Sequence, residues 1–169
     1  MKFKIQNSKF KIKEKELKTD KLIKVLLANR GIKTKKDMED FLNPSLKKIT
    51  TKSVVIDSKN LKKAVARIKL AIKNKEQIVV FGDYDVDGIC GTAILWETLN
   101  SIGAKVTPYI PHRIDEGYGL SVKAIQNSEF KIQNVKLIIT VDNGIVANKA
   151  VEFAKEQGID IIITDHHVP

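Results

Sequence analysis

The chain has 169 residues, enough for one domain with a small appendage, and its 43% hydrophobic content excludes a wholly disordered protein. Its single cysteine, Cys90, excludes a disulfide framework and a cysteine-rich zinc site, and suits a reducing compartment such as the cytoplasm. No apolar run reaches the roughly 18 residues of a membrane span, and we expect no secretory signal at the N-terminus.

The net charge of +10 is concentrated at the start of the chain. Residues 1–52 hold 16 Lys and Arg against 6 Asp and Glu, whereas residues 53–169 hold 14 of each kind. A basic segment beside a neutral domain is typical of a protein with a polyanionic partner. The alternative is a lysine-rich solvated surface, because Lys outnumbers Arg 15 to 1 in this segment.

The N-terminal segment is predicted to be mainly helical. Residues 1–13 alternate Lys with apolar residues, which indicates a two-stranded ribbon or a loose tail. Asp20 is then expected to cap a helix that ends at Gly31. Thr34 is expected to cap a second helix, which ends before the Asn43-Pro44 pair. We therefore treat residues 1–52 as a small basic helical segment that precedes the main domain.

From residue 53 onward, apolar strands alternate with amphipathic helices. Ser58 is expected to cap the first of these helices, and Ser121 to start a short one. Strands that are apolar on both faces are typical of a parallel sheet covered by helices. We predict a doubly wound parallel α/β domain over residues 53–169. The expected helices are 58–74, 89–101, a short one from 121, and 146–157; the expected strands are 78–81, 106–110, 137–141 and 159–164.

Three of the four expected strands end in acidic residues. In a parallel sheet the carboxyl ends of the strands meet at one edge, where ligands bind. The residues expected to converge there are Asp83, Asp85 and Asp87 after the first strand, Asp142 after the third, and Asp165, His166 and His167 after the fourth. Carboxylates this crowded cannot all stay ionised without a cation.

This donor set predicts a divalent metal centre. Oxygen and imidazole ligands without a thiolate suit Mn²⁺ or Mg²⁺ better than structural zinc. The carboxylates exceed the needs of one ion, so we expect two cations that share a bridging carboxylate, an arrangement that promotes phosphoester hydrolysis. The segment from Asp83 begins like an EF-hand calcium loop, but Ile94 occupies the twelfth position, where that loop needs glutamate. Taken alone, a strand-end Asp is usually a helix cap, so the joint pattern carries the prediction.

The acidic segments resemble the motifs of a known superfamily. The segments 80–88 (VFGDYDVDG), 140–144 (TVDNG) and 165–167 (DHH) are similar, in this order, to three motifs of the DHH phosphoesterase superfamily. Within it, segments 110–120 (IPHRIDEGYGL) and 41–44 (FLNP) resemble the RecJ-like single-stranded-DNA exonucleases. The resemblance covers about residues 20–169.

The resemblance implies roles for individual residues. Asp85 and Asp142 would bind one metal ion. Asp87, Asp142 and His166 would bind a second ion, with Asp142 bridging the two. Asp83 is a further candidate metal ligand.

Four more residues are implied to act on the substrate or on the site around it. His167 would face the scissile phosphate, and Asp165 would orient its neighbours. Arg113 would contact phosphate, and Tyr118 would stack on the DNA strand.

The resemblance implies metal-dependent hydrolysis of phosphodiester bonds in single-stranded DNA from the 5′ end, in DNA repair or recombination. Two alternatives stay open: another DHH phosphoesterase acting on oligonucleotides, cyclic dinucleotides or pyrophosphate, and a non-catalytic nucleic-acid-binding module. The family continues past its DHH motif with a further acidic ligand and more domains. We therefore expect these 169 residues to be the N-terminal part of a longer nuclease, with little activity alone.

Overall fold

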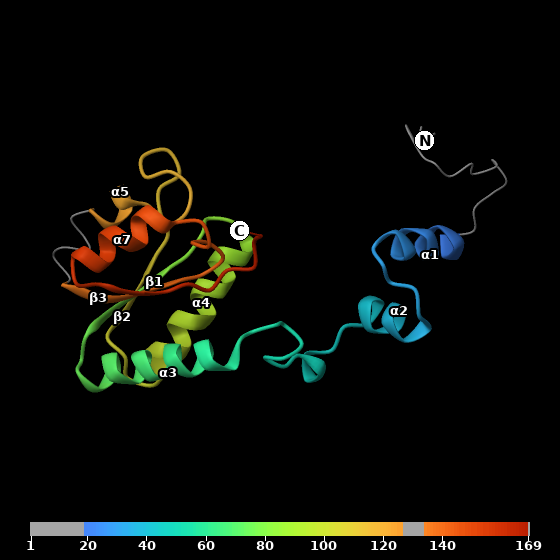
Figure 1. The fold of residues 1–169 in the computed structure, drawn as a ribbon, viewed down its shortest axis with the longest axis horizontal. Helices are drawn as coiled ribbons and strands as arrows, with labels where there is room; N and C mark the ends of the chain where they lie inside the picture. The colour runs from blue at the N-terminus through green and yellow to red at the C-terminus, as the bar shows by residue number, and fades with distance from the viewer. Residues whose placement is uncertain (1–18, 127–133, 169) are drawn as a thin grey trace. The chain divides into compact units, whose positions relative to one another are not determined.

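The structure is a computed structural model that describes residues 19–126 and 134–168 (Figure 1). The expected ribbon or tail over residues 1–13 lies outside the described residues. The chain forms two compact units, Met1–Ile56 and Asp57–Pro169, called here the N-terminal unit and the α/β unit. No helix in the described part of the chain is long and apolar enough to cross a membrane.

The N-terminal unit contains the two expected helices. They are α1 (Thr19–Asn29) and α2 (Lys35–Leu42), followed by a 3₁₀ turn, Leu46–Lys48. Thr34 caps α2 as predicted, because its hydroxyl oxygen accepts the backbone N–H of Asp37 at 3.1 Å. The prediction that Asp20 is the cap was wrong: the described part of α1 runs from Thr19, so Asp20 lies in the first turn, where a negative side chain still interacts favourably with the positive end of the helix.

The α/β unit is built on four parallel strands. These are β1 (Gln77–Phe81), β2 (Val106–Tyr109), β3 (Val135–Thr140) and β4 (Asp160–Ile162). Their order in the sheet is β2-β1-β3-β4, and every neighbouring pair is parallel. The predicted parallel sheet is therefore confirmed, and the central strands β1 and β3 place their carboxyl ends side by side.

Helices cover both faces of this sheet (Figure 1). On one face, α3 (Ser58–Lys73) and α4 (Val86–Ser101) pack against Ile78, Val80, Leu137 and Ile139. On the other, α5 (Val122–Ile125) and α7 (Asn148–Glu156) pack against Val79, Phe81 and Ile138. Because alternate residues of one strand point to opposite faces, each central strand contributes to both cores. This arrangement confirms the doubly wound fold.

Two helices of the α/β unit have an aspartate cap that the prediction did not assign, and a third, α7, begins at Asn148 rather than at residue 146. Asp57, not Ser58, caps α3 by accepting the N–H of Asn60 at 2.7 Å. Asp85 caps α4 by accepting the N–H of Gly88 at 3.0 Å, so this helix begins at Val86 rather than at residue 89. Aspartate satisfies the unpaired N–H groups of the first turn. The acidic motif is therefore continuous with the start of α4.

Arg67 ties α3 to the amino-terminal ends of the strands. Its Nε lies 2.5 Å from Asp160 Oδ2 at the start of β4, and one terminal nitrogen lies 2.8 Å from Glu76 Oε2. The other donates to the backbone carbonyl of Lys136 at 3.2 Å. This charged cluster lies at the opposite end of the sheet from the acidic strand ends, so it is structural.

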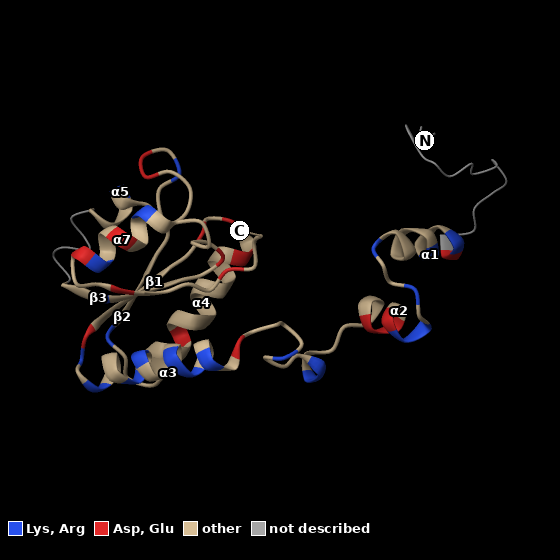
Figure 2. Cartoon of the chain, viewed as in Figure 1, with Lys and Arg blue, Asp and Glu red and all other residues tan. Residues whose placement is uncertain are grey.

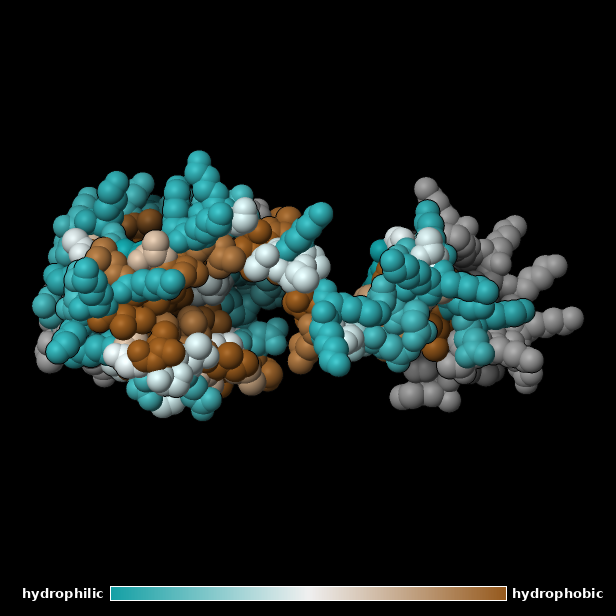
Figure 3. Space-filling view, turned by 90° about the horizontal axis from the view of Figure 1, so that it is seen from below, coloured by the Kyte–Doolittle hydropathy of each residue, from teal (hydrophilic) through white to brown (hydrophobic). Residues whose placement is uncertain are grey.

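The outer surface of the α3 and α4 layer is mixed in character. Figure 3 shows hydrophobic residues of the α/β unit exposed among hydrophilic ones. The exposed apolar side chains of this layer include Leu61, Val65 and Leu70 on α3, and Ile89 and Ile94 on α4. A helix that is apolar on more than one side, as α4 is, carries more apolar surface than one sheet face can cover.

Candidate metal centre

The first group of side chains that could hold a metal ion lies beyond the paired ends of β1 and β3. Phe81 and Thr140 are register partners at these ends, and the pairing continues as the N–H of Val141 donates to Phe81 O at 2.8 Å. Ligand oxygens of Asp83, Asp85 and Asp142 all lie within 4.8 Å of one another. Asp83 and Asp142 are buried and Asp85 is exposed. The group is therefore open to solvent on the side of Asp85 and covered by protein on the side of the other two.

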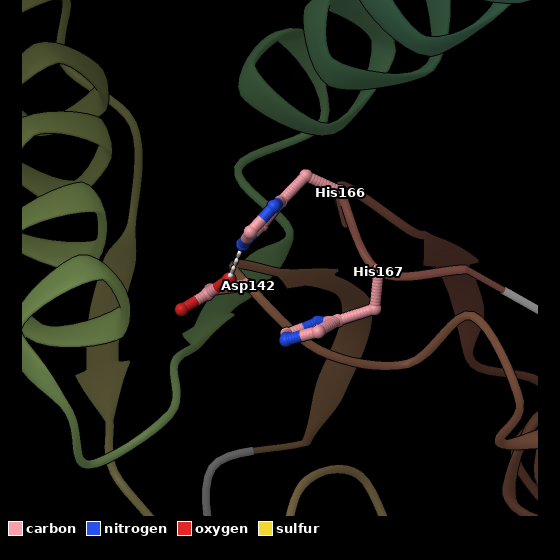
Figure 4. A group of neighbouring side chains, drawn as sticks. All are labelled: Asp142, His166 and His167. Atoms are coloured by element: carbon pink, nitrogen blue, oxygen red, sulfur yellow. Dashed lines mark ion pairs between the residues drawn. The ribbon is translucent and has the colours of Figure 1, made fainter. Parts of the chain in front are cut away.

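The second group joins Asp142 to the two histidines after β4 (Figure 4). His166 Nε2 lies 2.9 Å from Asp142 Oδ1, and the ring centroids of His166 and His167 are 4.6 Å apart. Both imidazoles are exposed, whereas Asp142 is only 8% exposed. Asp142 thus belongs to both groups, which is the position that a bridging ligand requires.

The backbone at Asp142 adopts a conformation that is uncommon for a residue with a side chain. Its φ is +63°, in the left-handed region, which aspartate tolerates better than most residues. The N–H of Asp142 donates to Thr164 O at 3.0 Å. Thr164 is held in turn by Thr140, through a hydroxyl-to-carbonyl bond of 2.5 Å and an N–H-to-hydroxyl bond of 3.2 Å. These bonds fix the shared carboxylate between β3 and the segment that carries the histidines.

Electrostatics at Asp142 oppose a free carboxylate. Burial, and then the neighbouring charge of Asp85, raise the pKa of the Asp142 carboxyl, while His166 partly offsets them. The buried Oδ1 of Asp142 makes no hydrogen bond within the described part of the chain, and its polar contact is the ion pair with His166. A divalent cation would remove the repulsion and coordinate this oxygen. The donors present therefore fit Mn²⁺ or Mg²⁺.

The Asp165 carboxylate contacts the residues around it and, among the described residues, belongs to neither of the two groups that could hold a metal ion. Its side chain is 1% exposed; Oδ1 accepts the N–H of His167 at 3.0 Å and lies 2.7 Å from His167 Nδ1, and Oδ2 accepts the N–H of Ile145 at 2.9 Å. Burial raises the pKa of Asp165, but these hydrogen bonds outweigh it and the pKa is lowered. The bond to Asp165 in turn raises the pKa of His167. This geometry suits a carboxylate that orients an imidazole and favours its charged form.

Asp87 and Gly88 lie in the first turn of α4. The Asp87 side chain is exposed, and within residues 19–126 and 134–168 it joins neither metal-ligating group.

A Cβ at Gly88 would lie 2.5 Å from Asp83 O and 2.7 Å from Asp83 C, which is far too close. Glycine at position 88 therefore allows the loop that carries Asp83 to lie directly on the helix.

Arg113 and Tyr118 lie together beside the first group. Arg113 Cζ is 4.9 Å from the ring centroid of Tyr84, and the rings of Tyr84 and Tyr118 meet edge to face at 6.0 Å. Burial, and then the charge of Asp83, raise the pKa of Tyr118 to about 12. The sequence prediction did not include Tyr84, although an aromatic residue between two strand-end aspartates was a usable signal. The three side chains form a cationic and aromatic corner next to the carboxylates.

Comparison with known proteins supports a common family. Residues 77–169 match the family described as "DHH family, N-terminal domain". The chain is 39% identical over 165 residues to the single-stranded-DNA-specific exonuclease RecJ of Bacillus subtilis (strain 168), covering 95% of this chain and 20% of the relative. It is 37% identical over 141 residues to RecJ of Thermus thermophilus, covering 83% of this chain and 19% of the relative.

Two solved structures resemble this chain. A crystal structure of exonuclease RecJ bound to manganese is 40% identical, with a TM-score of 0.59, over 65% of this chain and 28% of the other. A crystal structure of RecJ from Thermus thermophilus in complex with Mn²⁺ is 33% identical, with a TM-score of 0.58, over 85% of this chain and 18% of the other. The chain thus spans about a fifth of the length of the curated relatives that it matches.

Proposed function

The chain belongs to the DHH family, and we propose that it forms the metal-binding part of a nuclease that hydrolyses phosphodiester bonds in single-stranded DNA from the 5′ end. The observation that carries this proposal is the position of Asp142 in both metal-ligating groups. Relatives named as single-stranded-DNA-specific exonucleases support the substrate class. The 5′ polarity, a role in DNA repair or recombination, and a cytoplasmic location stay predictions.

The proposed cation ligands follow the two groups. Asp85 and Asp142 would hold one divalent cation, with Asp83 as a further ligand beside them. Asp142 and His166 would hold the other, and Asp87, whose side chain lies outside both groups in the described residues, stays a predicted further ligand of that ion. The manganese-bound relatives support Mn²⁺ as a cation that such a site accepts. Bound divalent cations would supply an activated water and neutralise charge that develops on the phosphate.

The neighbouring side chains would position the substrate. His167, favoured in its charged form by Asp165, would face the scissile phosphate and stabilise negative charge there. Arg113 would bind a backbone phosphate, and Tyr118 would stack on a base. Their place beside Asp83 supports this assignment, because the contacts to the strand would then flank the scissile bond.

The basic segment of residues 1–52 would add affinity without sequence preference. It holds 16 Lys and Arg against 6 Asp and Glu, and Figure 2 shows the charged residues of its described part. Neutralisation of DNA phosphates by such cations releases bound counterions, so its contribution should weaken steeply as salt increases.

The test is a binding titration of the 169-residue chain with a labelled oligonucleotide, with Mn²⁺ and with EDTA. We expect tighter binding of single-stranded than of duplex DNA, and Mn²⁺ dependence that Asp142→Asn abolishes. Asp160→Asn makes the same chemical change at the far end of the sheet and serves as the control. Binding that ignores Mn²⁺ and disappears when residues 1–52 are deleted would instead support a non-catalytic binding module.

A further inference from the structure

The side chain of Asn143 joins three segments of the chain at the metal centre. It is buried, with 1% exposed, directly after the shared ligand Asp142. Its Nδ2 donates to Val141 O at 2.9 Å and to Phe81 O at 3.3 Å, and its Oδ1 accepts the N–H of Leu120 at 3.1 Å. Both ends of the amide are therefore used, which fixes its orientation.

Each of these three partners adjoins a part of the site. Phe81 ends β1 and precedes the loop of Asp83, and Val141 precedes Asp142. Leu120 ends the segment 110–120. Asn143 thus connects both carboxylate-bearing turns to the segment that carries Arg113 and Tyr118.

The segment 110–120 is internally braced, so its position depends on where its ends are held. The carboxylate of Glu116 accepts the hydroxyl of Tyr109 at 2.5 Å and the N–H of His112 at 2.8 Å. At the other end, Leu120 is buried in the core, and a Cβ at Gly119 would lie 3.4 Å from Asn143 Cβ. The segment therefore behaves as a preformed loop that lies directly on Asn143.

The chemistry of position 143 is narrowly defined. An aspartate has the same shape, but it would place an unprotonated oxygen against the carbonyls of Val141 and Phe81. Alanine would leave the buried N–H of Leu120 and those carbonyls without this partner, and unmet buried groups are costly. Asn143 precedes Gly144, and an Asn-Gly pair often forms a turn. A turn alone would not need the three side-chain hydrogen bonds of Asn143 to Val141, Phe81 and Leu120.

We propose that Asn143 is a positioning residue that sets the distance between the metal-bearing turns and the loop of Arg113 and Tyr118. This inference rests on the proposed function, since it assigns the loop to the substrate of that site. Asn143 would touch neither the cation nor the reacting phosphate. Its effect would reach the substrate through Leu120.

The experiment compares Asn143→Ala and Asn143→Asp with the unsubstituted chain. Amide hydrogen exchange, measured without DNA, should accelerate at least about tenfold over residues 112–120 in both variants. Asn143→Ala removes the acceptor of the buried N–H of Leu120. Asn143→Asp keeps an acceptor, but its second oxygen is repelled by the carbonyls of Val141 and Phe81, which displaces the side chain from under the loop. Residues 65–73 on α3 should keep their exchange rates. Ile138→Val trims one methylene from the core and is the control for a general loss of stability.

A second measurement separates positioning from general damage. In Asn143→Ala, affinity for single-stranded DNA with Mn²⁺ should fall by about tenfold, while Mn²⁺ affinity should change by less than about threefold. Unchanged exchange over residues 112–120, or an equal loss of both affinities, would overturn the inference. If the unsubstituted chain binds neither Mn²⁺ nor DNA, the proposed function fails, and the exchange measurement alone then decides whether Asn143 positions the loop.

Discussion

Replacing Asp142 with asparagine should stabilise the metal-free chain and remove its response to Mn²⁺. Asparagine keeps the side-chain shape, tolerates the left-handed backbone at this position, and leaves the N–H bond to Thr164 in place. It removes a buried charge that lies within 4.8 Å of Asp85. Two unit charges at this separation repel by about 3–4 kcal/mol in an effective dielectric of about 20. Because Asp85 is exposed and His166 offsets part of the repulsion, we expect a gain of about 1–2 kcal/mol.

The pH dependence of this gain has a defined sign. The pKa of Asp142 is raised in the folded chain, so the folded form holds its proton more tightly than the unfolded form. Stability is therefore lost as the pH rises from the ordinary pKa of 3.8 through the folded-state pKa. Asparagine does not ionise. The gain should be present at neutral pH and should vanish below the ordinary pKa.

The assay is urea unfolding followed by the fluorescence of Trp96, the single tryptophan, which reports on the α/β unit. With EDTA, Asp142→Asn should unfold at higher urea than the unsubstituted chain. With Mn²⁺ at about 100 times its dissociation constant, the unsubstituted chain should gain about 2.7 kcal/mol and the variant almost nothing. Asp160→Asn, which loses a contact with Arg67, should lower stability by about 1 kcal/mol or less and keep the Mn²⁺ response.

Two results would refute this reasoning about Asp142. Destabilisation of the metal-free chain by Asp142→Asn would show that the carboxylate is stabilised by its contacts rather than opposed by Asp85. A Mn²⁺ response of normal size in Asp142→Asn would show that the cation does not need this residue.

Two further substitutions test the site through stability and titration. Gly88→Ala should lower the free energy of unfolding by about 1–3 kcal/mol, because the added Cβ meets the backbone of Asp83 at 2.5 Å, although alanine is otherwise the better helix former. Ala93→Gly in the same helix gives the pure propensity cost of about 1 kcal/mol, and stabilisation by Gly88→Ala would contradict the close contact. Asp165→Asn should lower the pKa of His167, measured by NMR titration of the imidazole. The raised pKa of His167 adds stability that is present below the ordinary value of 6.5 and is lost as the pH rises through the folded-state pKa. The variant should lack this added stability at low pH. An unchanged His167 titration would exclude the proposed pairing.

The fold was predictable where hydrophobic periodicity and chain order act alone. The strand around Ile78 and the strand around Ile138 were apolar on both faces, and this correctly placed them inside a parallel sheet. The start of α4 was predicted three residues late, because the cap and the metal ligand were treated as alternatives for a strand-end aspartate, whereas Asp85 caps the helix within the acidic motif. Helix capping and metal binding both call for a short carboxylate side chain, and hydrophobic periodicity predicts neither.

The long-range contacts of the site were beyond the sequence. The strand-end rule brought Asp85, Asp142 and His166 to one edge, but no local pattern shows that Asn143 reaches Leu120 or that Arg113 lies over Tyr84. These contacts depend on how the loop after β2 folds back over the strand ends. These contacts stabilise the fold by joining segments that are far apart in the chain, so the local propensities of the residues do not predict them.

The strand order β2-β1-β3-β4 also has a kinetic consequence. The candidate ligand positions run from Asp83 to His167, so no short stretch of chain can assemble the site by itself. Parallel pairing of distant segments is slow because each loop must close before its contacts form. A cation bound there would therefore act after the sheet is complete. It would slow unfolding of the α/β unit while leaving its folding rate nearly unchanged. Cation binding would therefore occur only in chains whose sheet has fully formed.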